Sequence, residues 1–312
     1  MGHILLLGAG FSRNWGAPLA SEIAGSLLSE LHSDPVLAPR LRGAPFEDAF
    51  AGFQRPGGDD ENSRRLRHLQ DVVTGLFARI NTALATTSFE FSNDRAFSVK
   101  EFLERFDAIF TLNQDLLLEI HYQPKLVSLK WSGVIVPGMV PGYEGGHPGQ
   151  SDPTKLTWKP GEAGVTPRMQ PYYKLHGSSG WKDEQGEAVL IMGSAKSGAI
   201  DRFPVLKSYH DAFRQALGQR GAKLMVIGYS FQDEHINRVI LEASNKTGLE
   251  TFIVDPNGIG ALKDPKMANA AIQPRRDIED IKIVGELRRP LSAIFRGDVF
   301  AHGELMRFFR SP

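Results

Sequence analysis

The stretch His3–Ser12, with the sequence HILLLGAGFS, constrains the fold of this chain more than any other. Ile4–Leu7 is a continuous apolar run, which is typical of a strand buried on both faces. Gly8-Ala9-Gly10 follows as a turn whose lack of side-chain bulk lets backbone N–H groups approach a phosphate. Apolar residues then recur at helical spacing from Leu19 to Leu31. Strand, glycine turn and helix together predict the first half of a nucleotide-binding βαβ unit.

The same glycine turn also has a simpler interpretation. Arg13 stands where the dinucleotide fingerprint would place its third glycine. A short glycine turn after a strand can serve only as punctuation before the next helix. The turn by itself leaves both interpretations open.

Charge and cysteine content exclude several classes of function. The 312 residues include 36 basic and 36 acidic side chains, so the formal net charge is zero. This balance gives no sign of a nucleic-acid partner or an anionic membrane surface, and it leaves self-association as a homo-oligomer open. The chain has no cysteine, which removes disulfides, thiolate nucleophiles and cysteine-based zinc sites.

Targeting and metal-binding patterns are missing from the sequence. No apolar run has the length of a bilayer span, and no basic region with a cleavable apolar segment precedes the first predicted strand. We find no P-loop, no HExxH motif and no metal-ligand spacing. We therefore expect a cytoplasmic protein that contacts no membrane and carries no metal.

Two segments interrupt the alternation of strands and helices. Residues 34–106 read as a mainly helical insertion, with a proline-broken loop and a short helical piece near 46–53, followed by helices at 60–86 and 99–106. Residues 124–171 are rich in glycine and proline and predict a loop-rich small module with a few short strands. We expect both to belong to one domain that spans residues 1–312.

Polar residues follow two further predicted strands. The strand at 107–112 leads into Asn113 and Asp115, and the strand at 171–175 leads into His176. Ligands of open α/β sheets bind at the carboxyl ends of parallel strands, so these side chains can converge on one cleft. Asp115 could instead cap the helix that follows it, and a lone histidine is more often structural than catalytic.

Two later predicted strands are also followed by glycine or polar residues. Residues 223–227 run into Gly228 and Ser230, and residues 251–254 run into Asp255. The carboxylate of Asp255 could bond a ribose hydroxyl, or it could simply start the turn at Pro256. Asp233 is expected to cap a helix over 235–243.

Four motifs occur in order at these predicted strand ends: GAGFS at Gly8–Ser12, TLNQD at Thr111–Asp115, KLHGS at Lys174–Ser178 and GYSFQD at Gly228–Asp233. Together they resemble the sirtuin superfamily. The resemblance is to the bacterial sirtuin-like NAD-consuming proteins of phage defence, of the Thoeris and defence-associated sirtuin type. It implies an α/β fold with a Rossmann-like, doubly wound, mainly parallel sheet and no zinc module.

The resemblance also implies roles for individual residues, with NAD as the substrate. Asn113 would hold the nicotinamide ribose and position the attacking group, and His176 would act as general base. Asp115 would contact the nicotinamide carboxamide. The remaining implied contacts are to the pyrophosphate and ribose for Gly8, Ala9, Gly10 and Ser12, and to the adenosine side for Gly228, Ser230 and Asp255.

Two departures from the classical sirtuin deacylases shape the expected activity. The four-cysteine zinc module is absent, and residues 13–18 lack the usual Pro-Asp-Phe-Arg continuation. We therefore expect an NAD+ glycohydrolase that releases nicotinamide and ADP-ribose as an anti-phage, abortive-infection effector. The alternatives are an NAD-dependent ADP-ribosyltransferase or deacylase, and a non-catalytic sensor of NAD or ADP-ribose. An effector of this kind could depend on a partner protein or a phage-derived activator.

Overall fold

A parallel sheet forms the centre of the computed structural model, which describes residues 2–43, 60–142, 152–161, 166–191, 200–263 and 277–310. Within these residues the sheet has seven strands in the order β11-β10-β9-β1-β2-β6-β3, and every neighbouring pair is parallel. The strands are β1 (His3–Leu7), β2 (Ala108–Thr111), β3 (Gly133–Ile135), β6 (Met169–Lys174), β9 (Lys223–Ile227), β10 (Glu250–Val254) and β11 (Ile283–Leu287). The predicted mainly parallel sheet is confirmed.

The sheet is doubly wound around β1. The chain passes from β1 to β2 on one side and later returns to β9 on the other side, so the strand order reverses at β1. Leu7 at the end of β1 aligns with Thr111 of β2 and with Ile227 of β9. Because these strands end level, the loops that follow them meet at one edge of the sheet, where such folds bind ligands.

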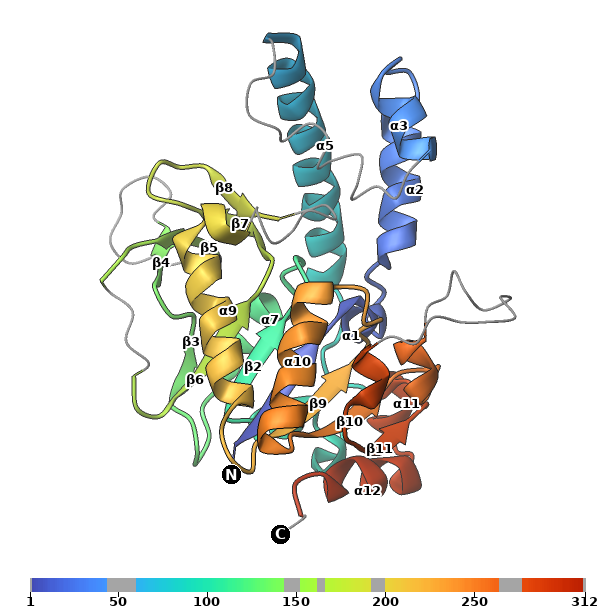
Figure 1. Cartoon of the computed structure of the whole chain (residues 1–312), viewed down its shortest axis with the longest axis vertical. Helices are drawn as coiled ribbons and strands as arrows, with labels where there is room; N and C mark the ends of the chain where they lie inside the picture. The colour runs from blue at the N-terminus through green and yellow to red at the C-terminus, as the bar shows by residue number, and fades with distance from the viewer. Residues whose placement is uncertain are drawn as a thin grey trace.

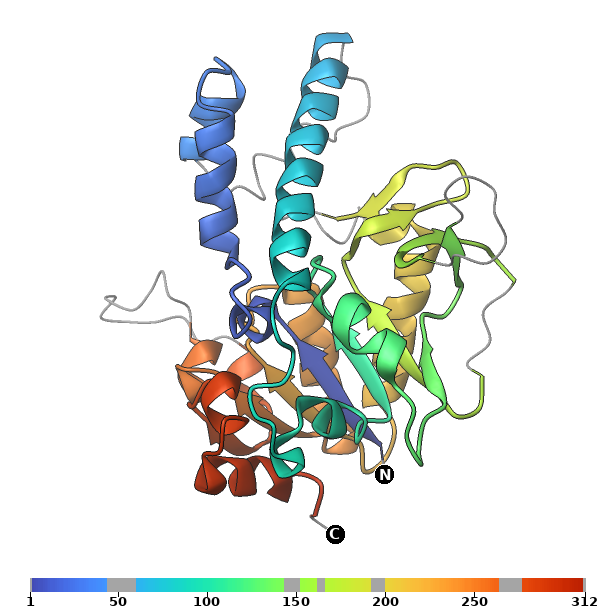
Figure 2. The same cartoon turned by 180° about the vertical axis from the view of Figure 1, so that it is seen from behind.

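Helices cover both faces of the sheet. On one face lie α9 (Pro204–Leu217) and α10 (Glu234–Thr247) (Figure 1), and on the other lie α6 (Val99–Leu103) and α7 (Leu117–His121) (Figure 2). Apolar residues recur every three or four positions along α9, and those that face the sheet are buried. Leu5, Leu6 and Leu7 of β1 are fully buried, as their continuous apolar run predicts.

Two helices extend away from the strand ends. These are α2 (Ala20–Glu30) and α5 (Asp60–Ala85), with α3 (Leu37–Gly43) beyond α2 (Figure 1). The prediction of a loop over residues 37–43 is wrong, because α3 forms there. Pro39 lies in the first turn of α3, where a missing N–H removes no helical hydrogen bond. The helical piece predicted at 46–53 lies outside the described residues.

A second, smaller sheet lies beside the first. Its strands are β4 (Met139–Gly142), β5 (Asp152–Trp158), β7 (Gly177–Lys182) and β8 (Ala188–Leu190), in the order β4-β5-β7-β8. β7 begins at the residue after His176. β4 and β5 come from the glycine- and proline-rich segment, whereas β3 of that segment joins the main sheet.

The remaining elements are short. They are α1 (Ala9–Arg13), the 3-10 turns η1 (Arg95–Phe97), η2 (Gln123–Lys125), η3 (Gly258–Leu262) and η5 (Asp277–Asp280), and the terminal helices α11 (Leu291–Ile294) and α12 (Val299–Arg307). β11 occupies one edge of the main sheet. None of the described helices combines the length and the apolar character that a membrane span needs.

Three glycines allow the ends of β1 and β9 to pack backbone against backbone. Gly10 N–H donates to Gly228 O at 2.9 Å, and Gly8 N–H donates to Ile227 O at 3.0 Å. A Cβ on Gly8 would lie 2.5 Å from Gly228 O, and one on Gly10 would lie 2.7 Å from Gly228 Cα. Gly228 has φ +63°, and a Cβ there would overlap backbone atoms of Gly10 and Phe11.

We expect Gly228→Ala to destabilise the protein more than Gly248→Ala does. Both glycines have positive φ, but a Cβ on Gly248 meets nothing within 4 Å. Gly248→Ala should therefore lose only the free energy needed to hold an alanine in the left-handed conformation, about 1–2 kcal/mol. Overlap at Gly228 should add about 1–3 kcal/mol. Urea denaturation of the two variants measures the difference, and equal losses would show that the close approach of the two loops is not rigid.

Candidate functional site

The strand ends enclose a cleft at the point where the strand order reverses. Its volume is about 1070 Å³. Residues that directly follow β1, β2, β9 and β10 line it, together with His176 from the turn after β6. A cleft of this size at this position fits a large ligand such as a dinucleotide.

Nine of the ten predicted site residues line this cleft. They are Gly8, Ala9, Gly10, Asn113, Asp115, His176, Gly228, Ser230 and Asp255. The tenth, Ser12, is buried in α1 behind Asn113. The convergence that the sequence predicted for strand-end residues is thus found in the structure.

The glycine turn itself differs from the expected phosphate loop. The five-residue helix α1 starts at Ala9, so the turn is shorter than the sequence indicated. The N–H of Gly8 donates to Ile227, the last residue of β9, and the N–H of Gly10 donates to Gly228, the first residue after it. In the structure, the absence of side chains at these two positions serves the close contact between the two loops.

Asn113 is held in a fixed orientation at the centre of the cleft. Its backbone N–H donates to Thr111 Oγ1 at 3.0 Å, and its side-chain Nδ2 donates to Ser12 Oγ at 2.9 Å. Ser12 is buried and belongs to the first motif, whereas Asn113 belongs to the second. Ser12 therefore orients the amide that faces the cleft.

Asp115 combines a structural contact with its place in the cleft wall. Its Oδ1 accepts a hydrogen bond from the N–H of Leu117, the first residue of α7, at 3.1 Å, although the N-cap residue of this helix is Leu116. Its backbone carbonyl accepts a hydrogen bond from Lys174 Nζ at 2.5 Å. The same ammonium group pairs with Glu119 at 2.6 Å, and both side chains are buried. Lys174 of the KLHGS motif thus holds the loop of the TLNQD motif in place.

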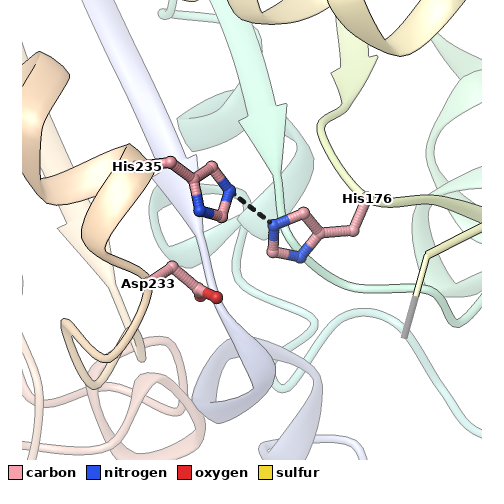
Figure 3. Close-up of side chains that lie close together, drawn as sticks. All are labelled: His176, Asp233 and His235. Carbon is pink, nitrogen blue, oxygen red and sulfur yellow. Dashed lines mark hydrogen bonds between the residues drawn. The ribbon is translucent and has the colours of Figure 1, made fainter. Parts of the chain in front are cut away.

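His176 lies against a second histidine that the sequence analysis did not single out. The Nε2 atoms of His176 and His235 are 3.2 Å apart, within hydrogen-bond distance (Figure 3). His176 is buried, and His235 is half-buried at the start of α10. One imidazole can donate to the other, which fixes the orientation of both rings in the cleft.

Asp233 was predicted to cap the helix that became α10. It does occupy the N-cap position, but its side chain makes no capping hydrogen bond. Instead its carboxylate lies near the two histidines (Figure 3). The sequence signal for this arrangement was the run Asp233-Glu234-His235, which closely follows the glycine at the end of a buried strand.

Asp255 has the turn-forming role that the sequence left open, and it also lines the cleft. Its Oδ1 accepts a hydrogen bond from Asn257 N–H at 2.8 Å, which forms the turn at Pro256, and the residue also lines the cleft. Burial raises the pKa of the Asp255 carboxyl, and the Asn257 hydrogen bond partly opposes that rise. Ser230 is exposed and also lines the cleft.

Three arginines in the cleft wall were also missed. Arg13 comes from α1, Arg238 from α10 and Arg289 from the loop after β11. Arg13 forms an ion pair with Glu22 at 2.7 Å, and Arg289 lies 3.6 Å from Asp298. Arginine side chains suit phosphate groups, which their planar forks bind bidentately. The sequence did not predict that these arginines share one cleft, because they lie far apart in the chain.

A family model described as a SIR2-like domain matches residues 107–276, more than half of the chain. One similar solved structure is titled "Structure of Sir2Tm bound to a propionylated peptide", with 12% identity, a TM-score of 0.33, and 97% of this chain and 94% of that chain covered. No curated protein matches. The family match includes Asn113, His176 and the three later strand-end residues of the cleft.

Proposed function

The chain belongs to the SIR2-like domain family, and from that premise we propose that it binds NAD+ and hydrolyses its nicotinamide–ribose bond. The products are nicotinamide and ADP-ribose. The observation that supports this proposal is that an oriented amide, Asn113, and an imidazole, His176, share one cleft at the switch point of the sheet.

The reaction needs little more than positioning and a proton acceptor. Nicotinamide leaves as a neutral molecule when the bond from its cationic ring to ribose breaks, and water adds to the sugar carbon. We propose that Asn113 holds the ribose and orients that water. His176 accepts the proton that the water loses, because the basic nitrogen of a neutral imidazole is a common general base in enzymes.

The neighbouring groups support this assignment. His235, 3.2 Å from His176, limits rotation of the reacting imidazole. The arginines of the cleft wall offer positive charge to the pyrophosphate, and Asp255 offers a carboxylate to a ribose hydroxyl. Asp115 lines the cleft two residues from Asn113, and we assign it to contact the carboxamide of nicotinamide.

A direct assay tests the proposal. Purified protein is incubated with NAD+, and nicotinamide and ADP-ribose are separated by chromatography; titration of NAD+ by calorimetry is run on the same sample. We expect both products in equal amounts. Binding without products would favour the non-catalytic sensor, and an acylated peptide losing its acyl group only with NAD+ would favour the deacylase. Absence of binding would contradict the proposal altogether.

We also propose a biological setting, which the resemblance of the four motifs to phage-defence proteins supports. In this setting the protein is a cytoplasmic effector that depletes NAD+ in an infected cell, as a homo-oligomer or with a partner or phage-derived activator. Bacteria that express the protein should lose NAD+ on phage infection and yield fewer phage. The Asn113→Ala variant should give no protection, and equal protection by that variant would contradict an NAD+-based defence.

A further inference from the structure

Three potential metal ligands meet at one point of the cleft. His176 comes from the turn between β6 and β7, whereas Asp233 and His235 come from the start of α10 (Figure 3). One ligand atom from each side chain lies within 4.8 Å of the other two. The two histidines are 59 residues apart in the sequence, so the cluster has no short metal-binding motif that the sequence could reveal.

The distance between the two imidazole nitrogens matches that of a metal-bound pair. In a tetrahedral zinc site the Zn–N bond is about 2.0–2.1 Å, which places two ligand nitrogens about 3.3–3.4 Å apart. The His176 and His235 Nε2 atoms are 3.2 Å apart. An ion can therefore take the place of the hydrogen bond between the rings. A carboxylate oxygen of Asp233 lies within 4.8 Å of a nitrogen of each histidine, so the side chain can approach an ion bound there.

The ligand set indicates which ions would bind. Two imidazoles and one carboxylate favour a transition ion such as Zn²⁺ over Mg²⁺ or Ca²⁺, which prefer oxygen ligands alone. Three protein ligands leave a fourth position for water on the side of the cleft. His210 does not complete the set, because its Nε2 contacts Leu175 O at 2.9 Å.

We propose that His176, Asp233 and His235 bind one divalent transition-metal ion of the Zn²⁺ type, and that the bound ion inhibits the protein. Inhibition follows because a neutral imidazole has only one basic nitrogen. When the ion binds Nε2 of His176, the ring proton lies on Nδ1, and no lone pair remains to accept a proton from water. The binding site rests on geometry alone, whereas the inhibition rests on the proposed function.

Calorimetric titration of the metal-free protein with ZnCl₂ tests the binding site. We expect one saturable site per chain, which His235→Gln and Asp233→Asn each weaken or remove. His68→Gln, an exposed histidine of α5, is the matched control and should leave the isotherm unchanged. Circular dichroism and thermal unfolding establish that each variant is folded. Absence of saturable binding, or equal binding by the two site variants and the control, would overturn the proposal.

A second assay tests inhibition separately. Nicotinamide release from NAD+ should fall as Zn²⁺ saturates the site and return when EDTA removes the ion. Binding without inhibition would overturn the inhibitory role and retain the site. If metal-free protein releases no nicotinamide, the proposed function fails, while the calorimetric result still decides the metal site.

Discussion

Purified protein with Asn113→Ala or His176→Ala is expected to lose nicotinamide release from NAD+. Removal of a general base typically lowers a rate by about 10²–10⁴-fold, so the His176→Ala rate should fall to the limit of detection. Asn113→Ala removes the amide that we assign to ribose and water, and the rate should fall to a similar level. Chromatographic measurement of nicotinamide over time, at saturating NAD+, gives both rates.

Stability measurements separate lost chemistry from lost structure. Asn113→Ala removes one side-chain hydrogen bond to Ser12, which contributes about 0.5–1.5 kcal/mol, so the variant should remain folded. Asn93→Ala makes the same chemical change at an exposed position outside the cleft and should keep full turnover. If Asn113→Ala or His176→Ala keeps near-native turnover, the role assigned to that residue is wrong.

Lys174→Met is expected to destabilise the folded protein by about 3–5 kcal/mol, the usual cost of removing one partner from a buried ion pair. Lys174 and Glu119 pair at 2.6 Å, with side chains that are 0% and 1% exposed. Methionine fills most of the volume of the lysine stem, so the loss reflects the uncompensated carboxylate and not a cavity. Urea denaturation at neutral pH measures the change in free energy of unfolding.

The pH dependence of this variant identifies the cause of its instability. Burial raises the pKa of Glu119 in the folded protein, and Lys174 opposes that rise. Without Lys174 the folded-state pKa should rise further above that of the unfolded chain. A carboxyl with a raised pKa stabilises the folded state at low pH, and this contribution is lost as the pH rises through the raised pKa. The deficit of Lys174→Met should therefore be smaller at pH 5 than at pH 8.

A double variant provides the control. In Lys174→Met/Glu119→Leu no charge remains buried, and replacement of a whole buried pair by apolar residues is often neutral. The double variant should therefore recover much of the stability that Lys174→Met loses. A double variant less stable than the single one, or a deficit independent of pH, would contradict an electrostatic origin.

Lys174 also connects stability to the site. Its Nζ holds the carbonyl of Asp115 at 2.5 Å, two residues from Asn113. The folded fraction of Lys174→Met should for this reason release nicotinamide more slowly than the parent protein. The double variant should recover stability but not this rate, because it still lacks the ammonium group.

The residues at the carboxyl ends of the strands could be predicted from the sequence, because local patterns mark where a buried strand ends. A buried parallel strand is a continuous apolar run, and the polar or glycine residue that ends it is visible at once. Asn113, His176 and Asp255 were located in this manner, and all three line the cleft. The helix α3 was missed because a proline in the first turn of a helix looks the same in sequence as a proline in a loop.

Contacts between residues far apart in the sequence could not be predicted. The pairing of Lys174 with Glu119 and the meeting of His176 with His235 join residues 55 and 59 positions apart. Single polar residues of this kind carry no periodic signal, and their partners are selected only when the strands align. Short strands were predicted in the glycine- and proline-rich segment, but their pairing into a second sheet was not. β7 pairs there with β5, which precedes it in the chain, and with β8, which follows it.

The sequence by itself determined the parallel sheet and the residues at its carboxyl edge, because apolar runs and glycine breaks act over a few neighbouring residues. The tertiary structure alone decided what those residues touch. It brought Gly8, Gly10 and Gly228 into a backbone contact between the ends of β1 and β9. It also placed the Asp233 carboxylate near the histidines, although Asp233 is the N-cap residue of α10. These outcomes depend on the register of β1 with β9 and on the placement of α10, which no local pattern specifies.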